Sequence, residues 1–310
     1  MFRSSPTGNK IAAALLLLAL NASADEASVS KPNAGMRYAS INLQSDGDNN
    51  RQFTGALGLS IGEHSWLQVG TGKLHIQQQS DALDPSLISL GGGLIGERFS
   101  VALSASQRND GDKYRQHDWS GTLDWHNSRV GIGVDALHRN MELRGAVPVT
   151  NNQGSIVSAP VYQSLNGNGI GLHGLINLTE RLAMSLGGMH YSYNSITHQD
   201  STNAPSGNNG GLLSTITNPL STQVSGVTRE TAALQHSWNA GIAYRLPKVA
   251  LIAQYFNDKG IENSGTLITT ELCAAFFIND HWTVSPAIGY STKEHAGGVT
   301  FGVLTTRYGW

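Results

Sequence analysis

The side chains best suited to chemistry in this sequence are five polar residues, each set within a short stretch of small and apolar residues. They are Lys73, Asp135, His173, Gln254 and Glu271. Ionisable groups in such surroundings usually line a polar pathway or pair with one another. A pathway would pass ions or small solutes, whereas a network of paired groups would only brace the structure. Both interpretations stay open, and the elements that carry these residues decide between them.

Residue patterns typical of enzymes and metal sites are weak in this chain. Gln235-His236-Ser237 is the nearest approach to a nucleophilic site. Neighbours along a strand point to opposite sides, so His236 and Ser237 cannot act together unless a bulge intervenes. The 11 histidines show no close spacing of the kind that binds metals, and Cys273 is the only cysteine. We therefore expect no enzyme activity, no metal and no cofactor.

The composition favours strands with two different faces. Only 14% of the residues are charged, against about 25% in ordinary soluble domains. Glycine is abundant, at 36 of 310 residues, yet the hydrophobic share is only 39%. This combination is typical of strands with one apolar face and one face of small polar residues. The formal net charge of −2 argues against nucleic acid as a partner.

Apolar residues alternate with small or polar residues along most of the sequence, which is the period of a β-strand. Phe99, Val101 and Leu103, for example, alternate with serine and alanine. Most such stretches are close to the roughly 9–11 residues that a tilted transmembrane strand needs. The 14 predicted strands run near 36–44, 52–62, 65–76, 87–95, 99–107, 116–125, 129–139, 168–178, 182–193, 231–245, 249–257, 266–278, 282–291 and 298–310.

The connections between these strands alternate strictly between longer and shorter ones. Short turns such as Gly96-Glu97-Arg98 and Asn279-Asp280-His281 separate the longer loops. An even-stranded barrel with both termini on one side of a membrane predicts this order, whereas a soluble β-sandwich has no reason to produce it. The sequence therefore predicts an all-β fold: a transmembrane, antiparallel, up-and-down β-barrel of about 14 strands, within a range of roughly 12–16.

Two of the longer loops stand out, residues 140–167 and 194–230. Loops longer than roughly 12–15 residues usually carry function or are disordered. The first contains short apolar runs that would let it extend the neighbouring strands above the membrane. The second would either fold into the lumen as a constriction or stand outside as a receptor surface. A flexible outside loop is the remaining interpretation of both.

Aromatic residues gather at two levels of the predicted strands, one beside the short turns and one toward the longer loops. Two such rings at the membrane interfaces form the aromatic girdle of a transmembrane barrel. Placing Trp66 on the apolar face with Leu74 turns Lys73 toward the lumen. The predicted girdle residues are Trp125, Tyr244, Trp282, Tyr308 and Trp310 beside the short turns or the chain end, and Phe53, Trp119, Trp238 and Tyr290 toward the loops.

Residues 1–24 are typical of a secretory signal peptide. The basic residues Arg3 and Lys10 precede an apolar run at 11–20, and Ala22-Ser23-Ala24 is a small-residue cleavage site. The apolar run of about ten residues is too short to cross a membrane as a helix. We expect an exported chain with a short periplasmic segment at 25–35 and the barrel at 36–310.

The last 12 residues, 299–310, alternate in character and end on an aromatic residue. Leu304, Tyr308 and Trp310 share one face of the strand because side chains two apart point the same way. This ending resembles the closing strand of Gram-negative outer-membrane β-barrels. The resemblance implies a protein of the cell outer membrane, surrounded by outer-membrane lipid, with both termini in the periplasm. It also implies the barrel-insertion machinery as a partner during biogenesis.

A barrel of this size with small residues on its non-lipid face is expected to act as a passive channel, a porin or an export conduit for small polar solutes. The five polar residues would then line the lumen near mid-height. The alternative is a plugged barrel that serves as a surface anchor, an adhesin or an assembly partner, with loops 140–167 and 194–230 binding a surface ligand. An outer-membrane enzyme is the third hypothesis.

Overall fold

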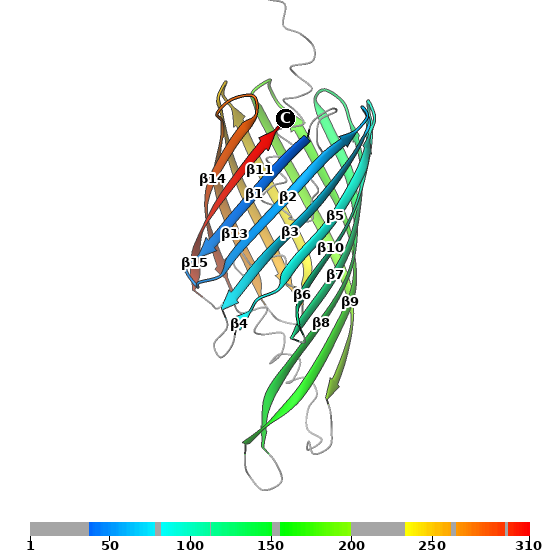
Figure 1. Ribbon diagram of the computed structural model, residues 1–310, viewed down its shortest axis with the longest axis vertical. Helices are drawn as coiled ribbons and strands as arrows, with labels where there is room; N and C mark the ends of the chain where they lie inside the picture. The colour runs from blue at the N-terminus through cyan, green and yellow to red at the C-terminus, as the bar shows by residue number, and fades with distance from the viewer. Residues whose placement is uncertain are drawn as a thin grey trace, which may run out of the picture.

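The computed structural model describes residues 37–77, 82–111, 113–150, 156–199, 233–261, 265–294 and 297–310 (Figure 1). The predicted signal peptide and the segment 25–35 lie outside these residues, so both stay predictions. Among the described residues, no helix has the length and apolar character that a membrane crossing requires.

Fifteen strands form one antiparallel sheet. The short β4 pairs only with the end of β3, which also pairs with β2 and β5, and every remaining strand pairs with two neighbours. Pairing of β1 with β15 closes a barrel of 14 strands, which confirms the predicted fold class. The strands are β1 (Arg37–Asp46), β2 (Arg51–Ile61), β3 (Ser65–Gln77), β4 (Ala82–Leu83), β5 (Ser86–Ile95), β6 (Phe99–Asp110), β7 (Tyr114–His126), β8 (Val130–Thr150), β9 (Ile156–Asn177), β10 (Leu182–Gln199), β11 (Leu234–Arg245), β12 (Val249–Gly260), β13 (Thr266–Phe277), β14 (Trp282–Lys293) and β15 (Gly298–Gly309).

Side chains on the outer face of the barrel are apolar and exposed. Ile88, Leu103 and Ile170 are 67%, 65% and 69% exposed, and similar residues continue around the barrel. A water-soluble protein rarely exposes a continuous apolar band of this extent, so the band is the lipid-facing surface of a transmembrane barrel. The next positions along the same strands, such as Ser89 and Ser104, face inward and are small and polar.

The short connections gather at one end of the barrel, which we call the short-turn end. Three of them are fixed by a side-chain oxygen of Asn127, Thr179 or Asn279. Each oxygen accepts hydrogen bonds from the backbone N–H groups two and three residues later, at 2.7–3.1 Å. Asparagine and threonine favour tight turns for this reason. The sequence pattern predicted these three turns correctly.

The C-terminal strand closes the barrel at the short-turn end. Trp310 and Arg37 exchange two backbone hydrogen bonds, with N···O distances of 3.3 and 3.0 Å. The ring of Tyr308 lies 4.8 Å from that of Trp282 and 5.8 Å from that of Trp310, measured between centroids. The chain end is therefore tied into the sheet and sits in an aromatic cluster on the lipid-facing surface. All nine residues predicted for the girdle occupy outward positions: Phe53, Trp119, Trp125, Trp238, Tyr244, Trp282, Tyr290, Tyr308 and Trp310.

The prediction of a loop at 140–167 is wrong for most of its length. The β8 strand runs on to Thr150 and β9 begins at Ile156, and these two residues pair in register. The two strands form a hairpin that extends beyond the other strands (Figure 1). Pairing satisfies the backbone hydrogen bonds of this segment. We call this end of the barrel the hairpin end.

The predicted loop 194–230 begins as strand, because β10 continues to Gln199. The remainder of that loop lies outside the described residues, so whether it enters the lumen stays untested.

The predicted facing of β3 is wrong. Trp66 points inward and is only 1% exposed, whereas Leu67 and Val69 belong to the lipid-facing band. The apolar band is continuous only if these two residues join it, because they pair with outward Leu59 and Leu57 of β2. Since alternation then carries Lys73 outward as well, this residue does not line the lumen.

Candidate functional site

Three inward-facing side chains from neighbouring strands form a hydrogen-bonded cluster at membrane depth. They are Asp124 on β7, Asp135 on β8 and His173 on β9. His173 Nδ1 lies 2.6 Å from Asp135 Oδ2, and His173 Nε2 lies 2.8 Å from Asp124 Oδ1. Outward neighbours such as Val134 and Leu172 belong to the apolar band. We call these three residues the Asp-His-Asp cluster.

A glycine makes room for the cluster. Gly133 lies directly opposite His173 in the β8–β9 register. A Cβ atom at position 133 would collide with the His173 ring and with the Asp124 carboxylate. The imidazole therefore lies flat over the glycine, and this position brings both ring nitrogens to carboxylates.

Hydroxyl groups hold the two carboxylates in place. Ser100 Oγ donates to Asp124 Oδ2 at 2.9 Å, and Thr122 Oγ1 donates to Asp135 Oδ1 at 2.8 Å. The cluster contains two acidic side chains and one imidazole, so it adds negative charge to this part of the interior.

The cluster is open to the interior of the barrel. The side chains of His173 and Asp135 are 33% and 25% exposed, although both point away from lipid. Other inward residues at this level are also half-buried, and nearly all are small and polar. We call this surface the lumen wall; it comprises Asn42, Thr54, Ser89, Ser104, Ser120, Thr122, Asp135, His173, Ser185, Asn239, Ser285 and Thr305.

Inward-facing residues nearer the hairpin end have different surroundings, because they are buried. A charged network lies there around Asp118, whose Oδ1 accepts from Arg139 Nε and whose Oδ2 accepts from Arg139 Nη2, both at 2.9 Å. Gln116 Nε2 donates to Asp118 Oδ2 at 2.6 Å, and Arg108 Nη1 lies 3.5 Å from the same oxygen. Tyr114 donates from its hydroxyl to Gln116 Oε1.

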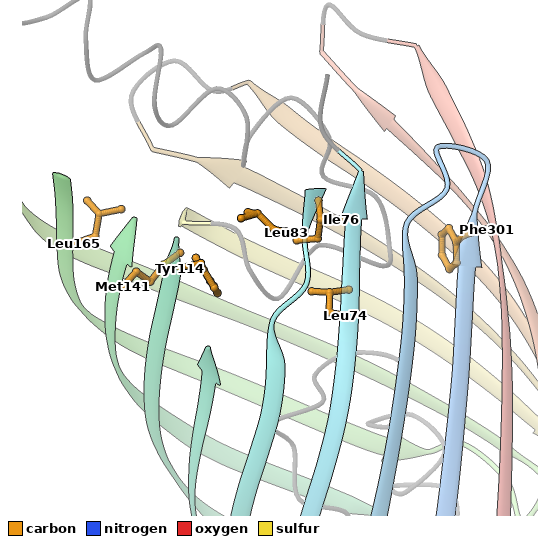
Figure 2. Packing of buried hydrophobic residues seen from close by; sticks show 7 residues of the cluster. All are labelled: Leu74, Ile76, Leu83, Tyr114, Met141, Leu165 and Phe301. Atoms are coloured by element: carbon orange, nitrogen blue, oxygen red, sulfur yellow. The ribbon is translucent and has the colours of Figure 1, made fainter. Parts of the chain in front are cut away.

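Apolar residues share this level with the charged network. Figure 2 shows seven of them gathered near the ends of the strands, on the inner face: Leu74, Ile76, Leu83, Tyr114, Met141, Leu165 and Phe301. Each is no more than 6% exposed. We call the apolar residues and the charged network together the mouth layer, because they lie inside the hairpin end of the barrel.

The five polar residues predicted from the sequence therefore separate into three places. Asp135 and His173 meet in the Asp-His-Asp cluster. Gln254 and Glu271 pair directly across β12 and β13, and both are buried. Their register continues through β14 to Phe301, so they belong to the edge of the mouth layer. Lys73 lies on the outer face.

The sequence reasoning missed Asp124, Asp118 and Arg139. Asp118 and Asp124 each precede an outward tryptophan, so alternation alone would have turned them inward. Their partners lie on other strands, and only the strand register brings those partners close.

The residues considered for catalysis do not assemble. The register shift of β11 lies before His236, so His236 and Ser237 keep the ordinary alternation. His236 faces outward, where its Nδ1 lies 3.0 Å from Nδ1 of His190, whereas Ser237 faces inward. Within the described residues, no group of three or more histidine, cysteine, aspartate or glutamate side chains is arranged to hold a metal ion.

No protein-family model matches this chain, and no curated protein sequence matches it. Solved structures do resemble it. One is a KdgM porin in complex with disordered oligogalacturonate, with 9% identity over 88% of this chain and 98% of that one, at a TM-score of 0.42. Another is the CymD monoaromatic hydrocarbon channel, with 9% identity over 90% and 88% of the two chains and a TM-score of 0.49.

A bacterial polysaccharide outer membrane secretin is also similar, with 8% identity over 89% of this chain and 99% of that one, at a TM-score of 0.46. The closed sheet and the lipid-facing band describe the same architecture in this chain. The described residues form a closed, antiparallel transmembrane β-barrel of 14 strands.

Proposed function

We propose that this protein is a passive channel for small polar solutes across the outer membrane. The observation that carries the proposal is the lumen wall. Its side chains point inward at membrane depth, yet they are half-buried rather than packed, and they are small and polar. A barrel of 14 strands is wider than the eight-stranded barrels whose side chains fill the interior.

The Asp-His-Asp cluster gives the channel a weak preference for cations. Its excess negative charge lies on the lumen wall, and a surrounding apolar band focuses the field of such a charge. The mouth layer opposes rapid flow, because its side chains are packed across part of the interior at the hairpin end. We therefore expect a small conductance with modest selectivity.

Planar-bilayer recording of the refolded protein tests this function. The wild-type protein should give discrete single-channel steps and a reversal potential that favours cations. Asp135→Asn removes one carboxylate from the lumen wall, so the cation-to-anion permeability ratio should fall by about twofold while conductance stays similar. Glu142→Gln is the matched control, because Glu142 faces outward and pairs with Arg115 at 3.9 Å. A ratio that responds equally to both variants would contradict the assignment of the lumen wall.

The second candidate function is a surface anchor, and one observation favours it. The β8–β9 hairpin extends beyond the other strands, where a partner would reach its backbone (Figure 1). If the protein gives no conductance in bilayers, the mouth layer seals the lumen and this function replaces the channel.

The orientation follows from the same architecture. The short-turn end, with β1 beginning and β15 finishing there, would face the periplasm, and the hairpin end would face the cell surface. The terminal aromatics would serve as a mark for the barrel-insertion machinery. Deleting residues 308–310 removes the Trp310–Arg37 backbone bonds and should leave the chain in the periplasm, open to degradation. Normal amounts of heat-modifiable protein in the membrane would contradict this.

A further inference from the structure

The outer face of the barrel carries a groove near the hairpin end, across the neighbouring strands β15, β1, β2 and β3. Its volume is about 730 Å³. The strand registers arrange its outward-facing residues in two rows. The row nearer the middle of the membrane is Leu304, Leu43, Phe53 and Lys73. The row nearer the rim is Gly302, Ser45, Arg51 and His75.

The groove exists because the row nearer the rim begins with two small residues, Gly302 and Ser45. A Cβ atom built on Gly302 would meet no other atom within 4 Å, so space is open above Leu304. Leu43, Phe53 and Leu304 are each 40–47% exposed and form an apolar floor. A floor of this kind, at the edge of the lipid-facing band, matches the acyl part of an amphiphile.

The other end of the groove is cationic. Arg51 and Lys73 are exposed, and within the described residues neither forms an ion pair or a side-chain hydrogen bond. His75 does have a partner, since its Nδ1 lies 2.7 Å from Asp84 Oδ1. Two unpaired cations beside an apolar floor are costly for a lipid-facing surface unless an anion neutralises them.

Exposed charges of both signs surround the groove at the hairpin end. Arg115, Arg144 and Lys259 lie on outward positions, and the carboxylates Asp48, Glu142 and Glu294 are there too, with Glu142 paired with Arg115. Arg51 and Lys73 therefore differ from the rest of this end in standing together beside an apolar floor, which is complementary to an anionic lipid headgroup with an acyl chain.

We propose that this groove binds a phosphorylated glycolipid of the outer leaflet. A phosphate group would contact Arg51 and Lys73, and an acyl chain would lie over Leu43, Phe53 and Leu304. The two parts follow one another around the barrel, because the apolar floor lies on β15, β1 and β2 and the cations lie on β2 and β3. The proposal depends on the hairpin end facing the cell surface, but not on whether the lumen conducts.

Native mass spectrometry of the full, refolded protein in detergent tests this site, with bisphosphorylated lipid A as the probe. The wild-type protein should retain one lipid, and Arg51→Gln with Lys73→Gln should lower the retained fraction by about tenfold, since two charge-assisted contacts to phosphate are lost. Arg115→Gln with Lys259→Gln removes the same charge elsewhere on the rim and should change retention by less than about twofold. If the two double variants lost lipid equally, the attraction would be spread over the rim, and the groove would not be the binding site.

A second variant tests the apolar floor without changing charge. Gly302→Leu fills the open space and should lower lipid retention, whereas Gly174→Leu, on the outward face of β9, should not. All variants should keep the heat-dependent gel shift of a folded barrel. Unchanged lipid retention in Gly302→Leu would contradict the placement of the acyl chain over Leu43, Phe53 and Leu304. Equal retention of dephosphorylated lipid A, or displacement of the lipid by inorganic phosphate, would overturn a phosphorylated glycolipid as the ligand.

Discussion

The mouth layer and the lumen wall contain the same kinds of group in opposite surroundings. In the mouth layer, the Asp118 side chain is 3% exposed and is held by two arginines. On the lumen wall, the Asp135 side chain is 25% exposed and is held by one histidine and one threonine. Both carboxylates point into the same barrel from neighbouring strands, so the difference lies in what packs around them.

This difference separates stability from permeation. A buried charge must be neutralised by its protein partners, because water cannot replace a lost one. A half-exposed charge shares its solvation with water, so its loss costs less stability but changes the field in the lumen. The mouth layer is therefore expected to hold the barrel together, and the lumen wall to decide what passes.

The largest expected effect is in the mouth layer. Asp118→Leu leaves Arg139 and Arg108 buried without their carboxylate, so the free energy of unfolding should fall by about 3–5 kcal/mol. Urea-induced unfolding from lipid vesicles, followed by tryptophan fluorescence, measures this. Asp135→Asn in the same assay should cost clearly less.

The matched control replaces the ion pair as a whole. Asp118→Leu combined with Arg139→Met removes both partners of the closest pair and should recover much of the lost stability, since apolar side chains of similar size can replace a buried pair. If Asp118→Leu and Asp135→Asn were equally destabilising, the two regions would not differ as described.

The sequence was sufficient for the fold, for a physical reason. Alternation with a period of two is imposed on every strand by lipid on one side, so the band from Leu57 to Leu304 is visible in the residues themselves. It failed on β3, because Trp66 and Leu67 are both compatible with the lipid face and nothing local decides between them. A shift of one residue in the predicted facing reverses every side chain of a strand, so Lys73 was predicted in the lumen although it lies on the outer face.

The site was harder to predict, because it depends on register between strands. Asp135 and His173 could be placed inward one at a time, but their contact requires that Gly133 lie opposite His173. The β8–β9 hairpin was missed because it lies beyond the apolar band, where lipid imposes no alternation on the sequence. Outside the apolar band, strands and loops have similar compositions, and only backbone pairing with a neighbouring strand distinguishes them.

A smaller effect is expected from filling the space beneath His173. Gly133→Ala places a methyl group where the imidazole lies, so both contacts to the carboxylates should break. The free energy of unfolding should fall by about 1–3 kcal/mol, and cation preference should rise because two carboxylates lose the histidine between them. Gly131→Ala is the control on the same inward face, since the nearest atom to its Cβ would be 3.8 Å away. An equal loss in both variants would mean that the cluster contributes nothing specific.

The last comparison uses two hydroxyl pairs, one on the lumen wall and one buried beside Glu271 at the edge of the mouth layer, and it includes the smallest expected effect. Ser104 Oγ and Ser120 Oγ lie 2.6 Å apart on the lumen wall, and Thr269 Oγ1 and Ser291 Oγ lie 2.9 Å apart in buried surroundings. Ser291→Ala leaves the Thr269 hydroxyl buried without that partner, which should cost about 1–3 kcal/mol. Ser104→Ala leaves the Ser120 hydroxyl where water can reach it, so the cost should stay below about 0.5 kcal/mol.

The same vesicle unfolding assay compares the two variants directly. Because residue type, substitution and pairing partner are nearly matched, solvent access is the main difference between them. A larger loss in Ser104→Ala than in Ser291→Ala would mean that the lumen wall is as dry as the mouth layer. Water would then not reach Asp135 and His173, and the path assigned to solutes would be closed at its middle.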